Sequence, residues 1–189
     1  MTTCSVEDCE KPTRTRGWCN RHYQRWLKHG DPLATLAYRD GPEAAFLART
    51  EPLVWSSCII WTGGTNRYGY GQLRVNGRQT FAHRYAWERV NGPIPDGLMI
   101  DHRCFERSCV NVEHLRIATR YQNSQHRSGP TRRSSTGVRG VSKNGNRFRA
   151  VVVANGTRHH LGSFGTVEEA SAAAQTKRAI LFGDFAGRA

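Results

Sequence analysis

The stretch "DHRCFERSCVNVEHLRIATRYQN", from Asp101 to Asn123, decides how this chain folds. It holds an aspartate, two histidines, two cysteines and two asparagines, which are side chains that bind metal ions and move protons. The apolar run "GLMIDH" leads into it, and "HLRIA" predicts a second strand. Thr119, followed three residues later by Gln122, then predicts a helix start with a capping box. The expected order is therefore strand, loop, strand, helix.

The cysteines have the spacing of zinc sites. Cys104, Cys109 and His114 offer three donors, and Cys58, on an upstream predicted strand, is the cysteine left to complete them. The N-terminal stretch holds a second set of three thiolates and one imidazole: Cys4, Cys9, Cys19 and His22. All six cysteines are then used in two structural Zn²⁺ sites. A free core cysteine at position 58 is the alternative to the second site.

Three residues of the opening stretch remain once the zinc donors are assigned: Asp101, His102 and Asn123. A carboxylate and an amide carbonyl are hard oxygen ligands, which suit a Mg²⁺-like ion and not a thiolate site. A neutral histidine beside such an ion can take a proton from water, which can then attack phosphorus. A surface Asp-His pair without chemistry is the alternative interpretation of these residues.

Composition indicates a polyanionic partner. The 189 residues carry a net charge of +13, which favours nucleic acid first and an anionic membrane surface second. No apolar run is long enough to span a membrane, and the polar N-terminus has no signal core, so a reducing cytosol is expected. From His114 to Val167 there is no acidic residue, while basic residues recur there: Arg116, Arg120, Arg127, Arg132, Arg133, Arg139, Lys143, Arg147, Arg149 and Arg158. This asymmetry favours binding of backbone phosphates.

The chain is expected to be an α+β protein made of small modules, because 38% hydrophobic residues are few for a single large core. Asn76-Gly77 predicts a hairpin, "HRYAWERVNG" a helix, and "GVRGV", "RFRAVVV" and "RHHLGSF" three further strands. Thr166 and Glu169 predict a capping box for a last helix that ends at Gly183. The expected division is a zinc module at 1–30, a linker with a short helix from Pro42 to Arg49 at 31–51, a central module at 52–128, a linker at 129–136 and a sheet-and-helix module at 137–185.

The central stretch resembles the ββα-metal core of HNH endonucleases, of the zinc-stapled kind found in phage-type homing endonucleases, and its ligand spacing resembles the His-Cys box group. The resemblance implies that His102 is the general base. It implies that Asn123 and Asp101 hold a catalytic Mg²⁺ or similar ion, and that a structural zinc is held by Cys58, Cys104, Cys109 and His114. His83 and Asn111 are then expected to be supporting residues.

Residues 137–185 resemble the APETALA/ethylene-response-factor type of DNA-binding domain, although this block lacks that family's tryptophans. The resemblance implies a three-stranded sheet that lies in the major groove. Strand alternation puts Arg147 and Arg149 on one face, with Arg139 and Arg158 expected on the neighbouring strands. The DNA-contacting residues expected here are Arg139, Lys143, Arg147, Arg149 and Arg158.

Together these features predict a site-specific, homing-type endonuclease that cuts double-stranded DNA, leaving a 5′ phosphate and a 3′ hydroxyl as the family resemblance implies. No membrane partner is expected, and the protein is expected to be a monomer or homodimer. It is expected in the cytoplasm (of the host cell if a phage encodes it) and not to be secreted. A DNA-binding transcriptional regulator with an inactive nuclease fold is the alternative from another class. A nuclease directed at RNA is a third possibility.

Overall fold

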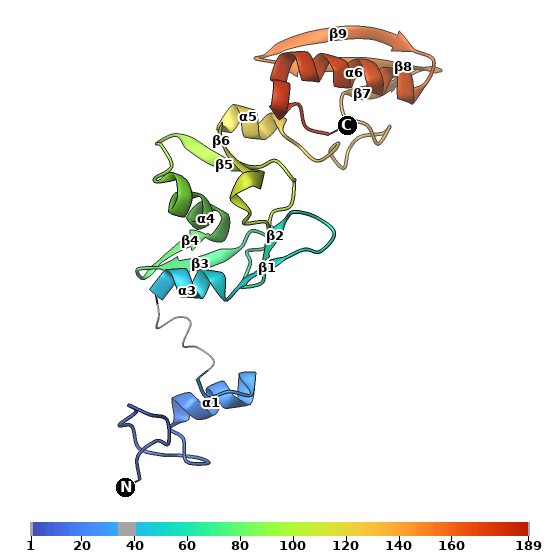
Figure 1. Cartoon of the computed structure of the whole chain (residues 1–189). Coiled ribbons are helices and arrows are strands. Elements are labelled where there is room, and N and C mark those ends of the chain that lie inside the picture. Colours follow the sequence, from blue (N-terminus) through green and yellow to red (C-terminus); the bar gives the residue numbers. More distant parts are fainter. Residues whose placement is uncertain (1, 34–40, 189) are drawn as a thin grey trace. The chain divides into compact units, whose positions relative to one another are not determined.

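The computed structural model describes residues 2–33 and 41–188 (Figure 1). The chain divides into two compact units, Met1–Ala82 and His83–Ala189. The predicted central module at 52–128 is thus shared between the two units, and residues 34–40 of the predicted linker lie outside the described residues. Among the described helices, none is both long enough and apolar enough to cross a membrane.

The first unit begins with a cysteine-rich segment that leads into helix α1, which ends at Gly30 in the left-handed conformation. The predicted short helix is also present, and the hairpin turn at Asn76 and Gly77 forms with positive φ at both residues, as a tight hairpin turn requires. Strands β1 and β2 form one antiparallel pair, and β3 and β4 another. The elements are α1 (Asn20–His29), α3 (Gly41–Leu47), β1 (Thr50–Pro52), β2 (Ile59–Trp61), β3 (Gln72–Val75) and β4 (Arg78–Phe81).

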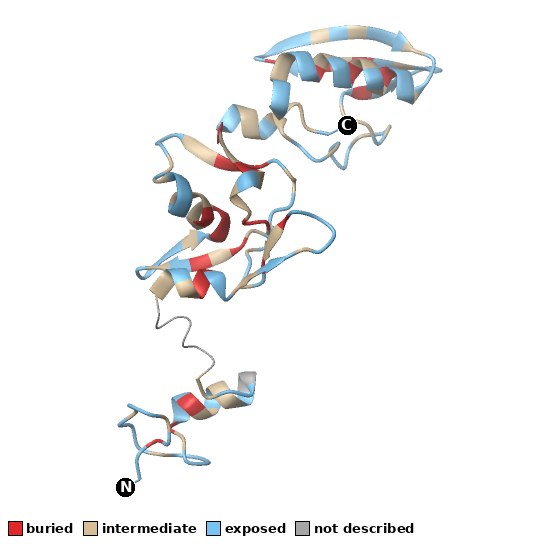
Figure 2. Ribbon diagram, in the orientation of Figure 1, coloured by how far each residue is buried: buried red, intermediate tan, exposed pale blue. Residues whose placement is uncertain are grey.

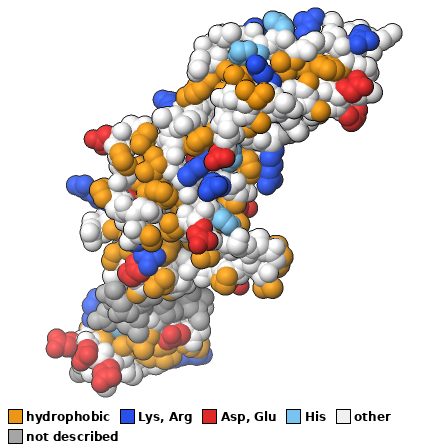
Figure 3. Space-filling model, turned by 45° about the horizontal axis from the view of Figure 1, so that its top comes forward, with side chains coloured by type: hydrophobic (Ala, Val, Ile, Leu, Met, Phe, Trp, Pro, Cys, Tyr) orange, Lys and Arg blue, Asp and Glu red, His pale blue; other side chains and the backbone are white. Residues whose placement is uncertain are grey.

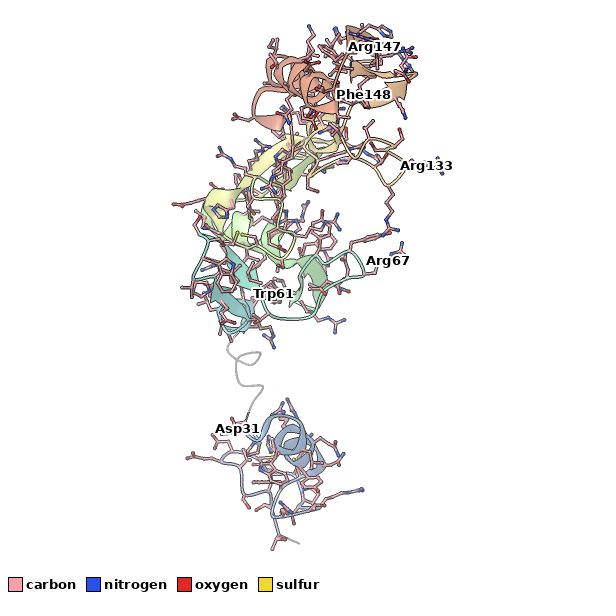
Figure 4. All side chains as sticks on the ribbon, turned by 90° about the vertical axis from the view of Figure 1, so that its right-hand side faces the viewer. Asp31, Trp61, Arg67, Arg133, Arg147 and Phe148 are labelled. Atoms are coloured by element: carbon pink, nitrogen blue, oxygen red, sulfur yellow. The ribbon has the colours of Figure 1, made fainter. Side chains whose placement is uncertain are left out.

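Trp61 organises the small core of the first unit (Figure 4). Its side chain is buried, stacks on Phe46 with ring centroids 5.9 Å apart, and donates its indole N–H to the carbonyl of Gly64. Gly71 lies so close to the ring that an added Cβ would come within 2.5 Å of it, so that no larger residue fits there. A single tryptophan with glycine neighbours therefore supplies much of the packing of this short-stranded region.

The second unit contains the strand, loop, strand, helix order that the opening stretch predicts. The two strands pair antiparallel with Asp101 opposite Arg116, and the Thr119 side chain caps the following helix in the expected capping box with Gln122. The hairpin and helix bury Ile100, Leu115 and Ala118. The elements are α4 (Ala82–Asn91), β5 (Leu98–His102), the 3-10 helix η1 (Val112–His114), β6 (Leu115–Thr119) and α5 (Arg120–Gln125).

A three-stranded antiparallel sheet with one helix completes the second unit. The strand order is β7-β8-β9, and α6 lies along one face of the sheet (Figure 1). Buried residues of the helix and of the strands meet there (Figure 2): Val141, Ala150, Val152, Ala170 and Ala174. The small alanines let α6 lie close to the strands. The elements are β7 (Val141–Asn144), β8 (Arg147–Ala154), β9 (Thr157–Phe164), α6 (Val167–Phe182) and the 3-10 helix η2 (Gly183–Phe185).

The first strand of this sheet does not lie where the sequence predicts it. "GVRGV" is a turn that only reaches β7 at its last residue. Gly137 and Gly140 both have positive φ, and the Thr136 hydroxyl donates to the carbonyl of Val141 at 3.0 Å. These local bonds compete with strand pairing, so the strand starts later, over "VSKN".

Candidate active site and metal clusters

Three thiols and one imidazole gather at the N-terminus, and their ligand atoms all lie within 4.8 Å of one another: Cys4, Cys9, Cys19 and His22. Cys4 Sγ is 3.2 Å from His22 Nδ1, and Cys9 Sγ is 3.9 Å from Cys19 Sγ. A tetrahedral zinc ion with ordinary bond lengths would separate its ligands by roughly 3.5–3.8 Å. Burial raises the pKa of the Cys4 thiol, but hydrogen bonds from the Cys19 N–H and from His22 outweigh it and lower that pKa to about 6. The cluster therefore fits a zinc ion.

A second group lies in the loop between β5 and β6. The ligand atoms of Cys104, Cys109 and His114 lie within 4.8 Å of one another, and Cys109 Sγ is 3.6 Å from His114 Nδ1. Cys109 is fully buried, and η1 places His114. The six cysteines, all of them in the described ranges, form no disulfide with one another, so metal ligation is open to all of them. Cys58, the predicted fourth ligand, lies directly before β2 in the first unit and is buried.

Asn111 holds the loop that carries these donors. Its side-chain oxygen accepts a hydrogen bond from the N–H of Glu113 at 3.1 Å, which caps η1. This contact favours a supporting role for Asn111, which stays a prediction, because η1 carries His114. The backbone carbonyl of Cys109, in the same loop, contacts the predicted base.

His102 is the last residue of β5 and is buried. Its Nε2 lies 3.0 Å from the carbonyl oxygen of Cys109. A carbonyl can only accept, so Nε2 carries the proton in the neutral ring and Nδ1 is the basic nitrogen. Burial lowers the pKa of His102, while the bond to Cys109 and nearby acidic groups oppose that shift. His102 is thus held as a neutral imidazole of defined tautomer at neutral pH.

The ring of His83, at the start of α4, packs against the ring of His102 with centroids 4.7 Å apart. Burial, together with the charges of His102 and Arg84, lowers the pKa of His83 to about 3. His83 is therefore neutral at ordinary pH and gives the other ring an uncharged neighbour. The predicted supporting role of His83 stays a prediction, with this contact in its favour.

Asp101 is buried and accepts two hydrogen bonds from basic side chains. Arg116 Nε donates to one carboxylate oxygen at 2.8 Å, and His126 Nδ1 lies 3.0 Å from the other. Phe185 of η2 packs on both partners, with its ring centroid 3.7 Å from the Arg116 Cζ and 6.3 Å from the ring centroid of His126. The carboxylate is thus fixed in position by residues that are distant in the chain.

The sequence interpretation missed the roles of Arg116, His126 and Phe185. Arg116 was expected among residues that contact phosphate, but it turns inward to Asp101. His126 follows Asn123 by three residues, which is the spacing that puts two side chains on one helix face. That spacing is a signal that could have found His126.

Asp101 and His102 are consecutive in β5, and successive side chains of a strand point to opposite faces. Their contacts agree with this alternation, since one residue binds Arg116 and His126 while the other meets Cys109 and His83. The base and the carboxylate therefore have separate supports. Their joint action around one ion stays a prediction.

The predicted DNA-contacting residues separate into two groups. Arg147 (labelled in Figure 4) and Arg149 of β8 are exposed on the sheet face away from α6. Arg158 of β9 pairs with exposed Val153 on that face. Lys143 is exposed on β7, opposite Phe148. Basic side chains also form several separate groups on the face seen in Figure 3.

The expectation that Arg139 lies on a neighbouring strand is wrong. Arg139 precedes β7, and its guanidinium donates to the Ala186 carbonyl at 3.2 Å and to the Gln125 side chain at 3.3 Å. The reason is the turn at Gly140, which directs Arg139 toward the end of α5 instead of along the sheet. Arg139 therefore does not share a face with Arg147 and Arg149.

A family profile described as HNH endonuclease matches residues 80–125, from the end of β4 to the end of α5. Protein 7.7 of Escherichia phage T7 is 43% identical over 68 residues, which are 36% of this chain and 52% of that protein. An uncharacterized HNH endonuclease, L560, of Acanthamoeba polyphaga mimivirus is 33% identical over 105 residues, 55% of this chain and 54% of that protein. This chain thus spans about half the length of these two relatives.

Protein 3.8 of Escherichia phage T7 is similar over most of its own length. It is 33% identical over 108 residues, which are 55% of this chain and 86% of that protein. No solved structure matches this chain. The profile spans β5, β6 and α5, which carry Asp101, His102 and Asn123. With the profile match and this coverage, the chain belongs to the HNH endonuclease family.

Proposed function

We propose that this protein is a site-specific, homing-type DNA endonuclease that hydrolyses a phosphodiester, with His102 as general base. The observation that carries the proposal is the anchoring of His102. Its Nε2–H is used by the Cys109 carbonyl at 3.0 Å, so that the basic nitrogen is Nδ1. A buried, neutral imidazole of fixed tautomer is suited to take a proton from water.

Asp101 and Asn123 are the proposed ligands of the catalytic divalent ion. Their oxygens are hard donors, which fits a Mg²⁺-like ion, and each carboxylate oxygen of Asp101 keeps a second lone pair beside its bond to Arg116 or His126. When bound, such an ion stabilises the negative charge on the leaving 3′ oxygen. Arg116 and His126 orient the carboxylate, and α5 supplies the Asn123 amide.

The separate supports of His102 and Asp101 suit an in-line displacement. His102 would act on the attacking water, on the side of the phosphorus opposite the leaving oxygen, and an ion held by Asp101 and Asn123 would supply positive charge at that oxygen. Two groups on opposite faces of one strand end can flank a phosphate in this way. His102 Nδ1 accepts one proton of the water while the water oxygen bonds to phosphorus and the P–O3′ bond breaks. The leaving 3′ oxygen takes a proton from solvent, so the products are a 5′ phosphate and a 3′ hydroxyl.

Cys58 is proposed to complete a structural zinc site with Cys104, Cys109 and His114. Three thiolates and one imidazole close a tetrahedral shell and leave no position for substrate, so this ion would do no chemistry. The N-terminal cluster of Cys4, Cys9, Cys19 and His22 is proposed to hold a second zinc ion in the same manner. The ion at Cys104, Cys109 and His114 would hold the backbone of Cys109, which in turn fixes His102.

The outer face of the C-terminal sheet is proposed to bind duplex DNA, as the APETALA-type resemblance implies. Arg147, Arg149 and Arg158 are exposed there, opposite the face that α6 covers. The arginines can contact backbone phosphates and base edges in a groove. Replacing Arg149 with Gln is expected to weaken DNA binding and reduce the salt slope of log K by about one.

The proposed activity is tested with supercoiled plasmid and phage DNA in the presence of Mg²⁺. The wild type should nick or linearise DNA, whereas His102→Ala and Asn123→Ala should bind DNA without cutting it. Ser124→Ala is the matched control, because Ser124 is exposed on the same helix. Far-ultraviolet circular dichroism and zinc content establish that each variant is folded.

Three outcomes would overturn the proposal or part of it. Tight DNA binding with no cleavage by the wild type, over a range of divalent ions, favours the transcriptional regulator. Equal cutting by wild type and His102→Ala rejects His102 as the base. Preferential cleavage of RNA over duplex DNA in the same assay favours the nuclease directed at RNA.

A further inference from the structure

A pocket of about 290 Å³ lies between α5, the turn before β7, and the end of α6. Its charged lining consists of three arginines: Arg127, Arg139 and Arg178. Tyr121 and Asn155 add polar groups, and the lining contains no acidic residue. The pocket is separate from His102 and from both cysteine clusters, whose residues do not line it.

Arg178 is the most unusual of these residues. It belongs to α6 and is only 3% exposed, although arginine is rarely buried without a charged partner. Its Nη1 donates to the carbonyl of Arg139 at 2.8 Å, but its Nε and Nη2 are buried and have no hydrogen-bond partner within the described residues. A desolvated guanidinium with two unused donors is unfavourable unless an anion joins it.

The two other guanidinium groups are held by neutral acceptors. Arg139 donates to the Ala186 carbonyl and the Gln125 side chain, and Arg127 Nε donates to the Ser124 carbonyl at 2.8 Å. Burial and the neighbouring charges of Arg178 and Arg127 lower the pKa of Arg139 to about 10. Three positive charges therefore face one another, and no carboxylate pairs with any of them in the described part of the chain.

Two glycines make this close approach possible. A Cβ at Gly140 would meet the Val151 carbonyl oxygen at 2.8 Å and Arg178 Nη1 at 3.4 Å. A Cβ at Gly187 would meet the Arg127 backbone and Arg139 Nη1 at 2.7 Å. Both glycines have positive φ, which other residues rarely adopt. The backbone is thus shaped around the converging arginines.

We propose that this pocket binds a phosphate group through the guanidinium groups of Arg127, Arg139 and Arg178. Guanidinium groups match phosphate geometry through paired N–H donors, and three positive charges suit the charge of a phosphate better than that of a single carboxylate. The site goes beyond the proposed nuclease activity, because it involves neither His102 nor the outer sheet face. The phosphate comes either from a nucleic-acid backbone that passes the junction of α5 and the sheet or from free phosphate.

The first experiment measures the thermal midpoint of the zinc-loaded full chain in sodium phosphate and in sodium chloride of equal ionic strength. A tenfold excess of phosphate over its half-saturating concentration should raise the midpoint of the wild type by about 3–6 °C. Arg127→Gln should reduce this gain, and Arg178→Met should abolish it. Arg78→Gln, which removes an exposed charge on β4, is the control and should keep the full gain.

Arg178→Met places an apolar side chain at a buried position. Arg127 is exposed, so Arg127→Gln tests the site without disturbing the core. If Arg178→Met fails to fold, the comparison of Arg127→Gln with Arg78→Gln still tests whether the pocket binds phosphate. Equal midpoints in phosphate and chloride for the wild type, or equal phosphate gains in Arg127→Gln and Arg78→Gln, overturn the proposal.

The second experiment identifies the source of the phosphate group by titrating a short DNA duplex, without Mg²⁺, at several salt concentrations. If the occupant is a backbone phosphate, Arg127→Gln should reduce the salt slope of log K by about one, and inorganic phosphate should compete with DNA at fixed ionic strength. If free phosphate is the occupant, Arg127→Gln should bind DNA with the same affinity as the wild type, and the wild type should still gain thermal stability in phosphate. Both readouts are independent of cleavage, so they also hold for a chain that fails to cut DNA.

Discussion

The two groups of zinc-type ligands use the same donors in different surroundings. The N-terminal cluster draws all four ligands from residues 4–22, a segment whose buried residues are all ligands. The loop of the second unit holds Cys104, Cys109 and His114 beside a buried histidine pair and a buried carboxylate. The first cluster can therefore only fold its own block, whereas the second holds the backbone that orients His102. The same ligand chemistry is thus expected to have a local effect in one place and, under the proposed function, a consequence for catalysis in the other.

The largest effect should follow from Cys109→Ser. Loss of this ligand should release the Cys109 carbonyl from His102 Nε2, lower zinc content from about two ions to about one, and reduce single-turnover cleavage by about 10³-fold, as loss of a general base does. Elemental analysis and a plasmid assay measure both quantities. Unchanged zinc content and an unchanged cleavage rate would contradict the role of the second cluster in orienting His102.

Arg116→Met should have the next largest effect on the second unit. Removing the partner of a buried carboxylate leaves Asp101 with an uncompensated charge, which costs about 3–5 kcal/mol in the free energy of unfolding. Urea unfolding measures the change, with Arg120→Met, at an exposed site of α5, as the control. Equal stability of the two variants would mean that the second cluster does not have the charged surroundings described above.

His83 should make the stability of the second unit depend on pH. Its pKa of about 3 in the folded state lies below its ordinary value of 6.5, so below pH 6.5 the unfolded chain binds a proton that the folded chain excludes. Stability should therefore fall as the pH drops from 6.5 toward 3, by about 2 kcal/mol between pH 6.5 and 5. His83→Gln should flatten this slope in urea unfolding at the two pH values. An unaltered slope would assign the pH dependence to other groups.

Cys19→Ser should have the smallest effect on the second unit. It should remove one zinc ion and unfold the N-terminal block, which becomes sensitive to protease, because so short a segment has little apolar core of its own. The single-turnover cleavage rate at saturating DNA should remain within about twofold, because His102 and its supports belong to the other unit. A rate loss as large as that of Cys109→Ser would contradict a purely local role for the first cluster.

Local signals in the sequence located most of the elements that carry the site. The capping boxes at Thr119 and Thr166 and the hairpin at Asn76 form as expected, because each depends on hydrogen bonds or dihedral preferences within a few residues. The prediction of a strand over "GVRGV" was wrong, and local hydrogen bonds and dihedral preferences are again the reason. There the turn at Gly137 and Gly140, with the Thr136 hydroxyl, outcompetes strand pairing.

The contacts around Asp101 could not be predicted in this way. His126 lies 25 residues away in sequence, and Phe185 reaches Arg116 from η2 at the far end of the second unit's chain. No local pattern distinguishes an arginine that turns inward from one that faces solvent. Arg116, Arg139 and Arg178 all look like ordinary basic residues in the sequence, yet each is directed into the second unit.

The sequence by itself determined the types of ligand, their grouping into soft and hard donors, and the strand, loop, strand, helix order that carries Asp101, His102 and Asn123. These depend on side-chain chemistry and on interactions over a few residues. Only the tertiary structure decided that a Cys109 carbonyl selects the tautomer of His102, that Asp101 is held by Arg116 and His126, and that three arginines converge on one pocket. Those outcomes follow from which faces pack together, because each buried polar group must find its partner among residues distant in the chain.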